Sequence, residues 1–146
     1  MGVVLGANAC TSPPSPTGRY LVHAINGATP LPATAFRPNT VQESQLMWGE
    51  LDFSTRGKAI FRWQHRFLTP GHPPDTLGVG VDTFLLHQSG SLLLLSRYSM
   101  VLWHGPDSVL VVDTVSQQGD ELIFRRKVGN EDGSISHWVY ALRRAH

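Results

Sequence analysis

Apolar and polar residues alternate with a period of two along many short segments from residue 18 onward. In residues 58–67, one face carries Phe61, Trp63, His65 and Phe67, and the other carries Arg62, Gln64 and Arg66. This period is typical of a β-strand with one buried face. Apolar residues never recur at helical spacing for three turns, so the pattern predicts no helix.

Segments rich in β-branched and aromatic residues, separated by Gly, Pro, Asp, Asn or Ser, predict eight strands. They are residues 19–25, 46–53, 58–67, 79–87, 91–96, 109–116, 121–128 and 135–143, and residues 98–103 form a ninth short strand or extend the fifth. Residues 17–144 are 128 positions, or 16 for each of eight strands, which suits a meander with short turns. We therefore predict an all-β fold, an antiparallel eight-stranded up-and-down β-barrel, because closure removes exposed strand edges.

Two predicted connections are longer than a hairpin requires. Residues 26–45 contain three prolines, and residues 69–78 read TPGHPPDTLG. Loops of this length are either binding loops and lids or ordered surface loops, and the sequence leaves both readings open. If the barrel binds a ligand, we expect an apolar pocket at the end near residues 26–45.

The first sixteen residues differ in composition from the rest. Small apolar residues lead up to Cys10, and the sequence TSPPSPTG follows it. Small residues directly before a cysteine are typical of a bacterial lipoprotein signal, and a proline-rich segment suits a tether. We predict that residues 1–16 are a partial export signal and tether, that residues 17–146 are the folded domain, and that lipid on Cys10 attaches the protein to a membrane. The alternative is an unstructured N-terminus with an incidental cysteine.

Composition narrows the class of protein further. The chain is 41% hydrophobic and 16% charged, which excludes wholesale disorder. Twelve basic against eleven acidic residues give a formal charge of +1, so no nucleic-acid partner is expected. One cysteine excludes an intrachain disulfide and a cysteine-based zinc site. No apolar run reaches the roughly 20 residues of a membrane-spanning helix, and nothing in the sequence defines an oligomeric state.

Three segments resemble bacterial lipocalin-like proteins, which are calycin-type β-barrels. They are GRYLVHAINGATPLP at residues 18–32, GDELIFRR at residues 119–126 and WVYALRR at residues 138–144. The resemblance implies an eight-stranded barrel that is exported to the bacterial cell envelope and often lipid-anchored. It also implies that Gly18 and Tyr20 close one barrel end against Arg143 or Arg144, with a cation over the aromatic face. The chain has Tyr20 where that group has tryptophan.

Candidate chemistry centres on His65, which shares an apolar strand face with two aromatic residues. The residues expected to line a cavity are Phe61, Trp63, His65, Trp138 and Tyr140. A histidine in such a position is more often a hydrogen-bonded core residue than a ligand or base. The seven histidines show neither an HExxH motif nor an i, i+4 pair, so no metal and no cofactor are expected.

Four acids lie within predicted strands. Glu50, Asp52, Asp82 and Asp113 are expected to face solvent and to pair with Arg62, Arg66, Arg97 and Arg125. Two of them beside His65 would instead form a proton-transfer site. Three functions therefore stay open: a non-enzymatic barrel that binds a small apolar ligand or an envelope component, a small barrel enzyme that uses His65 with an interior carboxylate, and a structural interaction domain.

Overall fold

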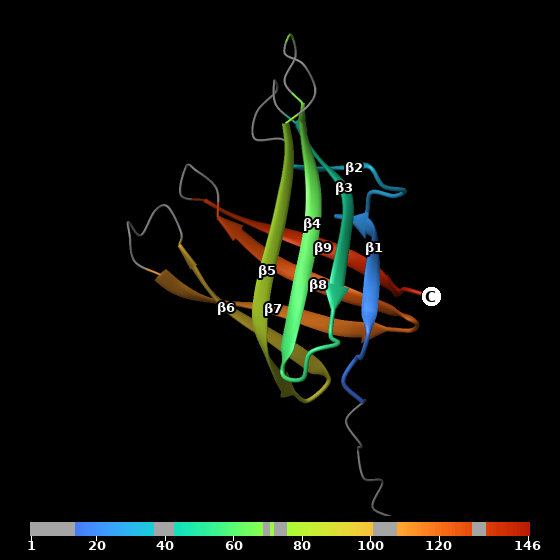
Figure 1. The fold of residues 1–146 in the computed structure, drawn as a ribbon, viewed down its shortest axis with the longest axis vertical. Helices are drawn as coiled ribbons and strands as arrows, with labels where there is room; N and C mark the ends of the chain where they lie inside the picture. Colours follow the sequence, from blue (N-terminus) through green and yellow to red (C-terminus); the bar gives the residue numbers. More distant parts are fainter. Residues whose placement is uncertain (1–13, 37–42, 69–70, 72–75, 101–107, 130–133) are drawn as a thin grey trace, which may run out of the picture.

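The computed structural model describes residues 14–36, 43–68, 71, 76–100, 108–129 and 134–146 (Figure 1). These residues form strands, turns and short connections, with no helix that could cross a membrane. The strands are β1 (Arg19–Ile25), β2 (Ala33–Phe36), β3 (Glu43–Asp52), β4 (Lys58–Leu68), β5 (Thr76–Ser89), β6 (Leu92–Met100), β7 (Ser108–Gln118), β8 (Glu121–Gly129) and β9 (Ile135–Arg144). Each of the eight predicted strands is present within a few residues of its expected bounds.

Eight of the strands close into an antiparallel barrel. Their order around it is β1-β9-β8-β7-β6-β5-β4-β3, and pairing of β1 with β3 closes the circle. Apart from the closing pair, each strand lies beside its neighbour in the sequence, as an up-and-down barrel requires. The predicted fold class is confirmed, and the barrel is compatible with a lipocalin-like fold.

The two ends of the barrel differ in their connections. At one end, which we call the closed end, tight turns join β3 to β4, β5 to β6 and β7 to β8. Gly57, Gly90 and Gly119 have φ angles of 73°, 60° and 63° in these turns, a conformation that favours glycine. Every longer connection lies at the other end, which we call the loop end.

Strand β2 lies within the segment that the sequence predicted as a loop. Strand β1 pairs with β3 only through Arg19, Tyr20 and Leu21, so the first half of β3 needs another neighbour. Strand β2 takes that place, with Ala33 opposite Leu46. Strand β2 is only four residues long and lies between Pro32 and Pro38, too short for a period of two to indicate a strand.

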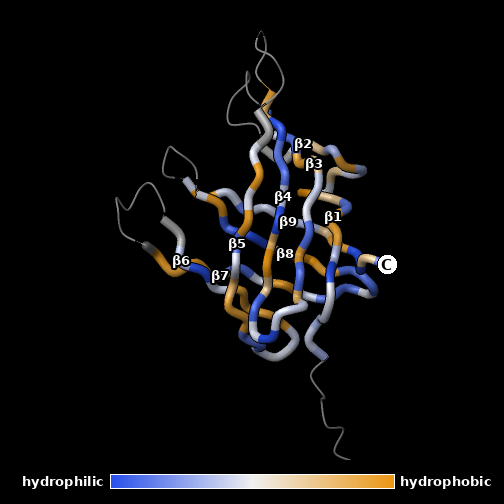
Figure 2. The backbone as a smooth tube through the Cα atoms, in the orientation of Figure 1, coloured by the Kyte–Doolittle hydropathy of each residue, from blue (hydrophilic) through white to orange (hydrophobic). Residues whose placement is uncertain are grey.

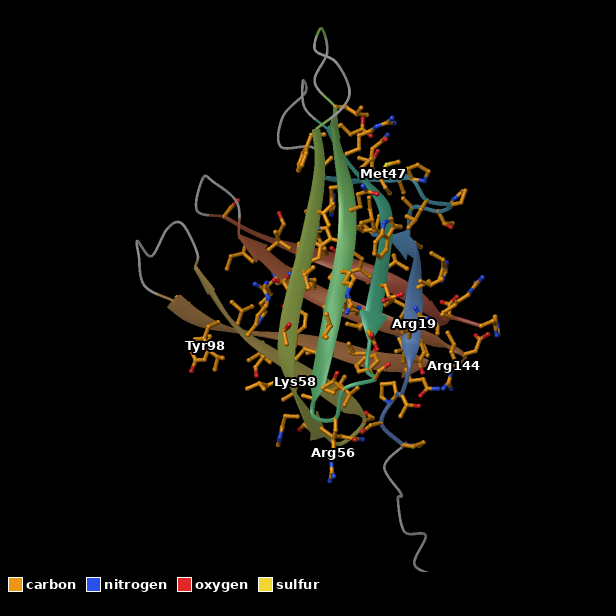
Figure 3. All side chains as sticks on the ribbon, in the orientation of Figure 1. Arg19, Met47, Arg56, Lys58, Tyr98 and Arg144 are labelled. Atoms are coloured by element: carbon orange, nitrogen blue, oxygen red, sulfur yellow. The ribbon has the colours of Figure 1, made fainter. Side chains whose placement is uncertain are left out.

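The β6–β7 hairpin separates from the barrel wall toward the loop end (Figures 1 and 3). Strand β6 pairs with β5 only from Leu92 to Ser96, whereas it pairs with β7 over its whole length. Strand β7 pairs with β8 only from Thr114 to Gln118. We call residues 97–100 and 108–113 the β6–β7 leaf, because no other described strand pairs with them.

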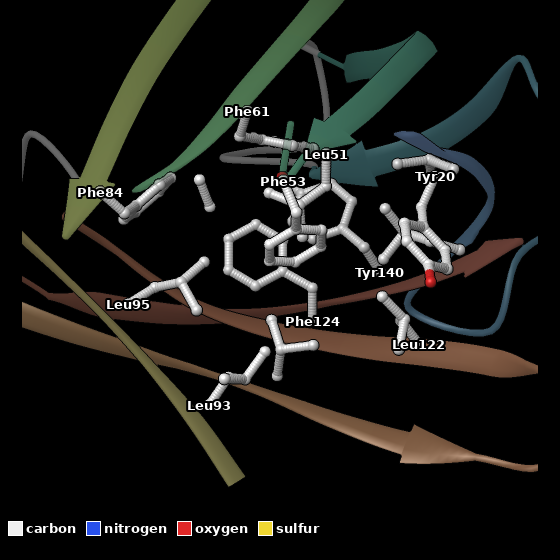
Figure 4. Packing of buried hydrophobic residues seen from close by; sticks show 14 of the residues in the cluster. Tyr20, Leu51, Phe53, Phe61, Phe84, Leu93, Leu95, Leu122, Phe124 and Tyr140 are labelled. Carbon is white, nitrogen blue, oxygen red and sulfur yellow. The ribbon is translucent and has the colours of Figure 1, made fainter. Parts of the chain in front are cut away.

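Hydrophobic side chains fill the barrel toward the closed end. Figure 2 shows hydrophobic and hydrophilic positions following one another within single strands. Phe61, Phe84, Phe124 and Tyr140 are fully buried, and the ring of Phe61 lies 5.2 Å from Phe124 and 5.0 Å from Tyr140 (Figure 4). These edge-on contacts add to the stabilisation from burial of the rings. The core therefore occupies the part of the interior nearer the closed end.

Candidate functional site

Four charged side chains form ion pairs with one another inside the barrel, on the loop-end side of the aromatic core. They are Asp82 on β5, Arg97 on β6, Asp113 on β7 and Arg126 on β8, and we call them the charged cluster. Arg126 pairs with Asp82 through Nη2, and its Nε lies 3.9 Å from Oδ2 of Asp113. Nε of Arg97 lies 3.5 Å from the same oxygen. Because two acids meet two bases, the cluster carries no net charge when all four groups are ionised.

The charged cluster lies where the backbone ladders stop. The N–H of Lys127 would pair with β7 in a continuous ladder, but it donates instead to Oδ1 of Asp113 at 2.8 Å. The carbonyl of Lys127 accepts a hydrogen bond from Nη2 of Arg97 at 3.2 Å. Side chains therefore satisfy the backbone groups that separation of the β6–β7 leaf would leave unpaired.

Burial and aromatic contacts define the environment of Arg126. Its side chain is 6% exposed, and its guanidinium carbon lies 4.9 Å from the Trp63 ring centroid and 5.2 Å from that of Phe61. A cation over aromatic faces is attracted by the ring quadrupole. Burial raises the pKa of Asp113, while the Lys127 N–H and both arginines counteract that rise. Arg126 thus links the aromatic core to the buried Asp113 and the partly exposed Asp82.

His65 lies closer to the loop end, on the same inward face of β4 as Phe61 and Trp63. The residue is 4% exposed, and its Nδ1 lies 2.8 Å from Oγ of Ser44 on β3. Its Nε2 is buried without a hydrogen-bond partner among the described residues. Burial, with a smaller contribution from Arg126, lowers the pKa of His65 to about 4, so the imidazole is neutral at neutral pH.

Aromatic side chains surround His65 at the loop end. Its ring centroid lies 5.4 Å from that of Trp138 and 6.4 Å from that of Phe67. Phe67 is 47% exposed, and Trp63 and Trp138 are half-buried. We call Trp63, His65, Phe67 and Trp138 the aromatic mouth. The aromatic mouth thus combines three partly exposed rings with one buried polar atom, Nε2 of His65.

Two glycines in β5 make room for these rings. Gly80 lies opposite Trp63, and a Cβ atom at Gly80 would be 2.0 Å from Cζ2 of the indole. Gly78 lies opposite His65, and a Cβ atom there would be 3.0 Å from Cε2 of Phe67. The Trp63 indole therefore lies directly against the backbone of β5, a position that any larger residue at Gly80 would block.

The predicted cavity residues divide into two groups. Phe61 and Tyr140 are fully buried and belong to the core, whereas Trp63, His65 and Trp138 lie in the aromatic mouth. Burial also raises the pKa of the Tyr140 hydroxyl. The interior is therefore filled at the level of Phe61 and Tyr140, and the partly exposed rings lie only at the loop end.

The predicted barrel-closing residues meet at the closed end, but not as a cation over an aromatic ring. Nη2 of Arg144 lies 3.4 Å from the carbonyl of Thr17 and 3.8 Å from the Cβ position of Gly18. Tyr20 packs edge-on against Phe53 at 5.9 Å, and Arg143 pairs with Glu121 at 2.8 Å. Within the described residues, Arg97 and Arg126 make the cation–π contacts instead. Arg144 ends β9 and is exposed, so its charge stays outside the core.

The expectation that in-strand acids face solvent holds for β3 and is wrong for β5 and β7. Glu50 and Asp52 pair with Arg62 on the outer surface. Asp82 and Asp113 point inward, as does Arg97, which had been expected on the surface. Arg126 was missed, although its parity with the apolar residues Leu122 and Phe124 indicates an inward position. Its outward neighbour Arg125 donates to Oγ of Ser116.

Other histidines and tryptophans, and Cys10, lie on the surface or outside the described residues. His87 and His137 are exposed, and Trp48 is 42% exposed next to an irregularity in the β3–β4 register. Cys10, His72, Trp103 and His104 lie outside the described residues. Within the described part of the chain, no three His, Cys, Asp or Glu side chains form a group that could hold a metal ion. The aromatic mouth and the charged cluster are thus the candidate site.

Comparison of the chain with protein-family models, curated protein sequences and solved structures finds no match.

Proposed function

We propose that the barrel binds a small, partly apolar ligand at its loop end. The supporting observation is the unpartnered Nε2 of His65, which lies beside the half-exposed rings of Trp63 and Trp138. Binding sites for small molecules combine aromatic walls with a few polar groups that orient the ligand. A planar ligand would stack on these rings, and a ring that moves aside would open the buried Nε2 to one polar atom of the ligand.

The chemistry of His65 supports binding better than catalysis. A base with a pKa of about 4 accepts a proton poorly at neutral pH. The interior carboxylates of Asp82 and Asp113 are paired with Arg126 and Arg97, and the polar partner of His65 is the hydroxyl of Ser44. These contacts favour a neutral imidazole that holds a hydrogen bond over one that transfers a proton.

A titration with 8-anilinonaphthalene-1-sulfonate, a planar and largely apolar fluorescent probe, tests this proposal. We expect saturable binding to the folded protein. Replacement of Trp138 by leucine should weaken binding at least about fivefold, the loss expected for one aromatic contact. Trp48→Leu is the matched control, because Trp48 is exposed on the outside of β3.

Two outcomes would contradict ligand binding at the loop end. The first is no saturable fluorescence change for wild-type protein that is shown by circular dichroism to be folded. The second is an equal loss of affinity in Trp48→Leu and Trp138→Leu, which would place the probe elsewhere. Native mass spectrometry of protein purified without denaturant then identifies any molecule that co-purifies with it.

We further propose that the protein is exported to the bacterial cell envelope and carries lipid on Cys10. The support is the order of the sequence, in which small apolar residues, the single cysteine and a Pro/Ser-rich tether precede the barrel. Mass spectrometry of protein recovered from the membrane fraction should detect an acylated Cys10. Cys10→Ser should then release the protein from that fraction, and an unmodified wild-type Cys10 would refute the proposal.

A further inference from the structure

Strand β5 has a long edge that no strand of the described residues pairs with. It is a 14-residue strand that pairs with β4 from Thr76 to Leu85, but pairs with β6 only from Leu85 to Ser89. Because β6 turns away into the β6–β7 leaf, no described strand covers the other edge of β5 over residues 76–84 (Figure 1). Such an edge offers main-chain donors and acceptors to another extended chain.

Backbone direction shows which residues offer those groups. The N–H of Leu86 donates to the carbonyl of Gly57, on the β4 side of β5. Backbone groups alternate between the two edges of a strand, so Val79, Val81 and Thr83 direct their N–H and C=O groups away from β4. These are the groups that a continuous β5–β6 ladder would have used.

The side chains beside this edge are apolar and exposed. Val79, Val81 and Leu85 are 70%, 60% and 60% exposed on the outward face of β5. Tyr98, on the leaf across the gap, is 74% exposed (Figure 3). Protein edges are normally protected by lysine, proline or an inward charge. The outward row Val79, Val81, Thr83 and Leu85 has no charge, and the inward Asp82 is neutralised by Arg126.

We propose that this edge pairs with the same edge of a second copy of the chain. Antiparallel pairing about a two-fold axis at Val81 places Val81 opposite Val81 of the second copy and Val79 opposite Thr83. Each of these pairs would exchange two main-chain hydrogen bonds. The outward rows bring no like charges together, and a formal charge of only +1 on each chain opposes association weakly. The dimer would also cover the exposed valines.

Sedimentation velocity of the full chain over a range of concentrations tests the proposal, in reducing buffer so that Cys10 forms no intermolecular disulfide. The wild type should shift from monomer to dimer as concentration rises. Val81→Pro removes an N–H that faces away from β4, so it should leave the β4–β5 ladder intact. Loss of two hydrogen bonds at the centre of the interface should raise the dimer Kd at least about tenfold.

Two further variants distinguish edge pairing from other association. Val81→Lys introduces a charge on the same face and should also prevent dimerisation, and it keeps the test valid if Val81→Pro fails to fold. Leu21→Lys alters an exposed aliphatic residue on β1, which is paired on both edges, and should leave the dimer unchanged. A wild type that stays monomeric up to about the millimolar range would overturn the proposal, as would a dimer that tolerates both Val81 variants.

Discussion

The inward positions of β5–β8 are apolar in the half of the barrel toward the closed end and charged in the half toward the loop end. Toward the closed end they carry Leu86 and Phe84 on β5, Leu93 and Leu95 on β6, Val115 on β7, and Leu122 and Phe124 on β8. The next inward positions toward the loop end are Asp82, Arg97, Asp113 and Arg126. In the apolar half, the ladders between these strands are continuous; in the charged half, two of them stop. Side-chain charges thus replace backbone pairing in the wall of the charged half.

The two halves of the barrel are stabilised in different ways. The apolar half is stabilised by burial of rings in contact, which depends little on pH or salt. The charged half buries groups that are tolerated only while they are paired, and it lies next to the half-exposed rings of the aromatic mouth. We therefore expect changes in the charged half to affect both stability and ligand binding, and changes in the apolar half to affect stability alone.

The largest effect should follow from replacement of Arg126 by methionine. The variant removes one partner from Asp113, which is fully buried, and from Asp82, which is 25% exposed, and this should lower the free energy of unfolding by about 3–5 kcal/mol. Urea denaturation measures the change. Arg125→Met is the matched control on the same strand, because Arg125 faces outward and its loss should cost less than about 1 kcal/mol. Equal effects in the two variants would show that the charged cluster does not stabilise the wall.

The second effect is a pH dependence that His65 confers. Its pKa is lowered from 6.5 in the unfolded chain to about 4 in the folded barrel, so the unfolded state binds the proton more tightly. Stability is therefore fully present above about pH 6.5 and decreases as pH falls toward 4, by about 3 kcal/mol in total. His65→Gln keeps a group that can bond to Ser44 but cannot titrate. The wild-type decrease between pH 7 and 4 should exceed that of His65→Gln by this amount, and parallel curves would refute the prediction.

Most of the fold could be predicted from the sequence, because each strand buries one face and the period of two is visible in residues such as Phe61, Trp63 and His65. The same parity indicated that Trp138 and Tyr140 face inward together. The charged cluster could not be predicted, because surface acids and arginines are far commoner than buried ones. Only the register shows that Asp82 and Arg126, 44 residues apart, meet inside the barrel. Separation of the β6–β7 leaf has no local signal, since β6 begins with four consecutive leucines and shows no alternation that changes at Arg97 or Tyr98.

A smaller effect should come from the glycines that accommodate the aromatic mouth. Gly80→Ala places a Cβ atom within 2.0–2.5 Å of the Trp63 indole, so the ring must move. We expect a loss of about 1–3 kcal/mol and a shift in tryptophan fluorescence. Gly78→Ala is the control, since its nearest atom, at 3.0 Å, belongs to the half-exposed ring of Phe67, which can turn aside. A fluorescence spectrum unchanged in Gly80→Ala would show that Trp63 does not lie against β5.

The smallest effect should come from an ion pair of the same chemical type on the barrel surface. Arg143 contacts Oε1 of Glu121 through Nε at 2.9 Å and Nη2 at 2.8 Å, and the arginine side chain is 63% exposed. Solvent screens this pair, so Glu121→Gln should lower the free energy of unfolding by less than about 1 kcal/mol, and high salt should reduce that difference further. Arg126→Met should retain its larger cost at high salt, because the side chains of Arg126 and Asp113 are only 6% and 0% exposed. If salt reduced both effects alike, the charged cluster would be open to solvent, and the proposed division of the interior would be wrong.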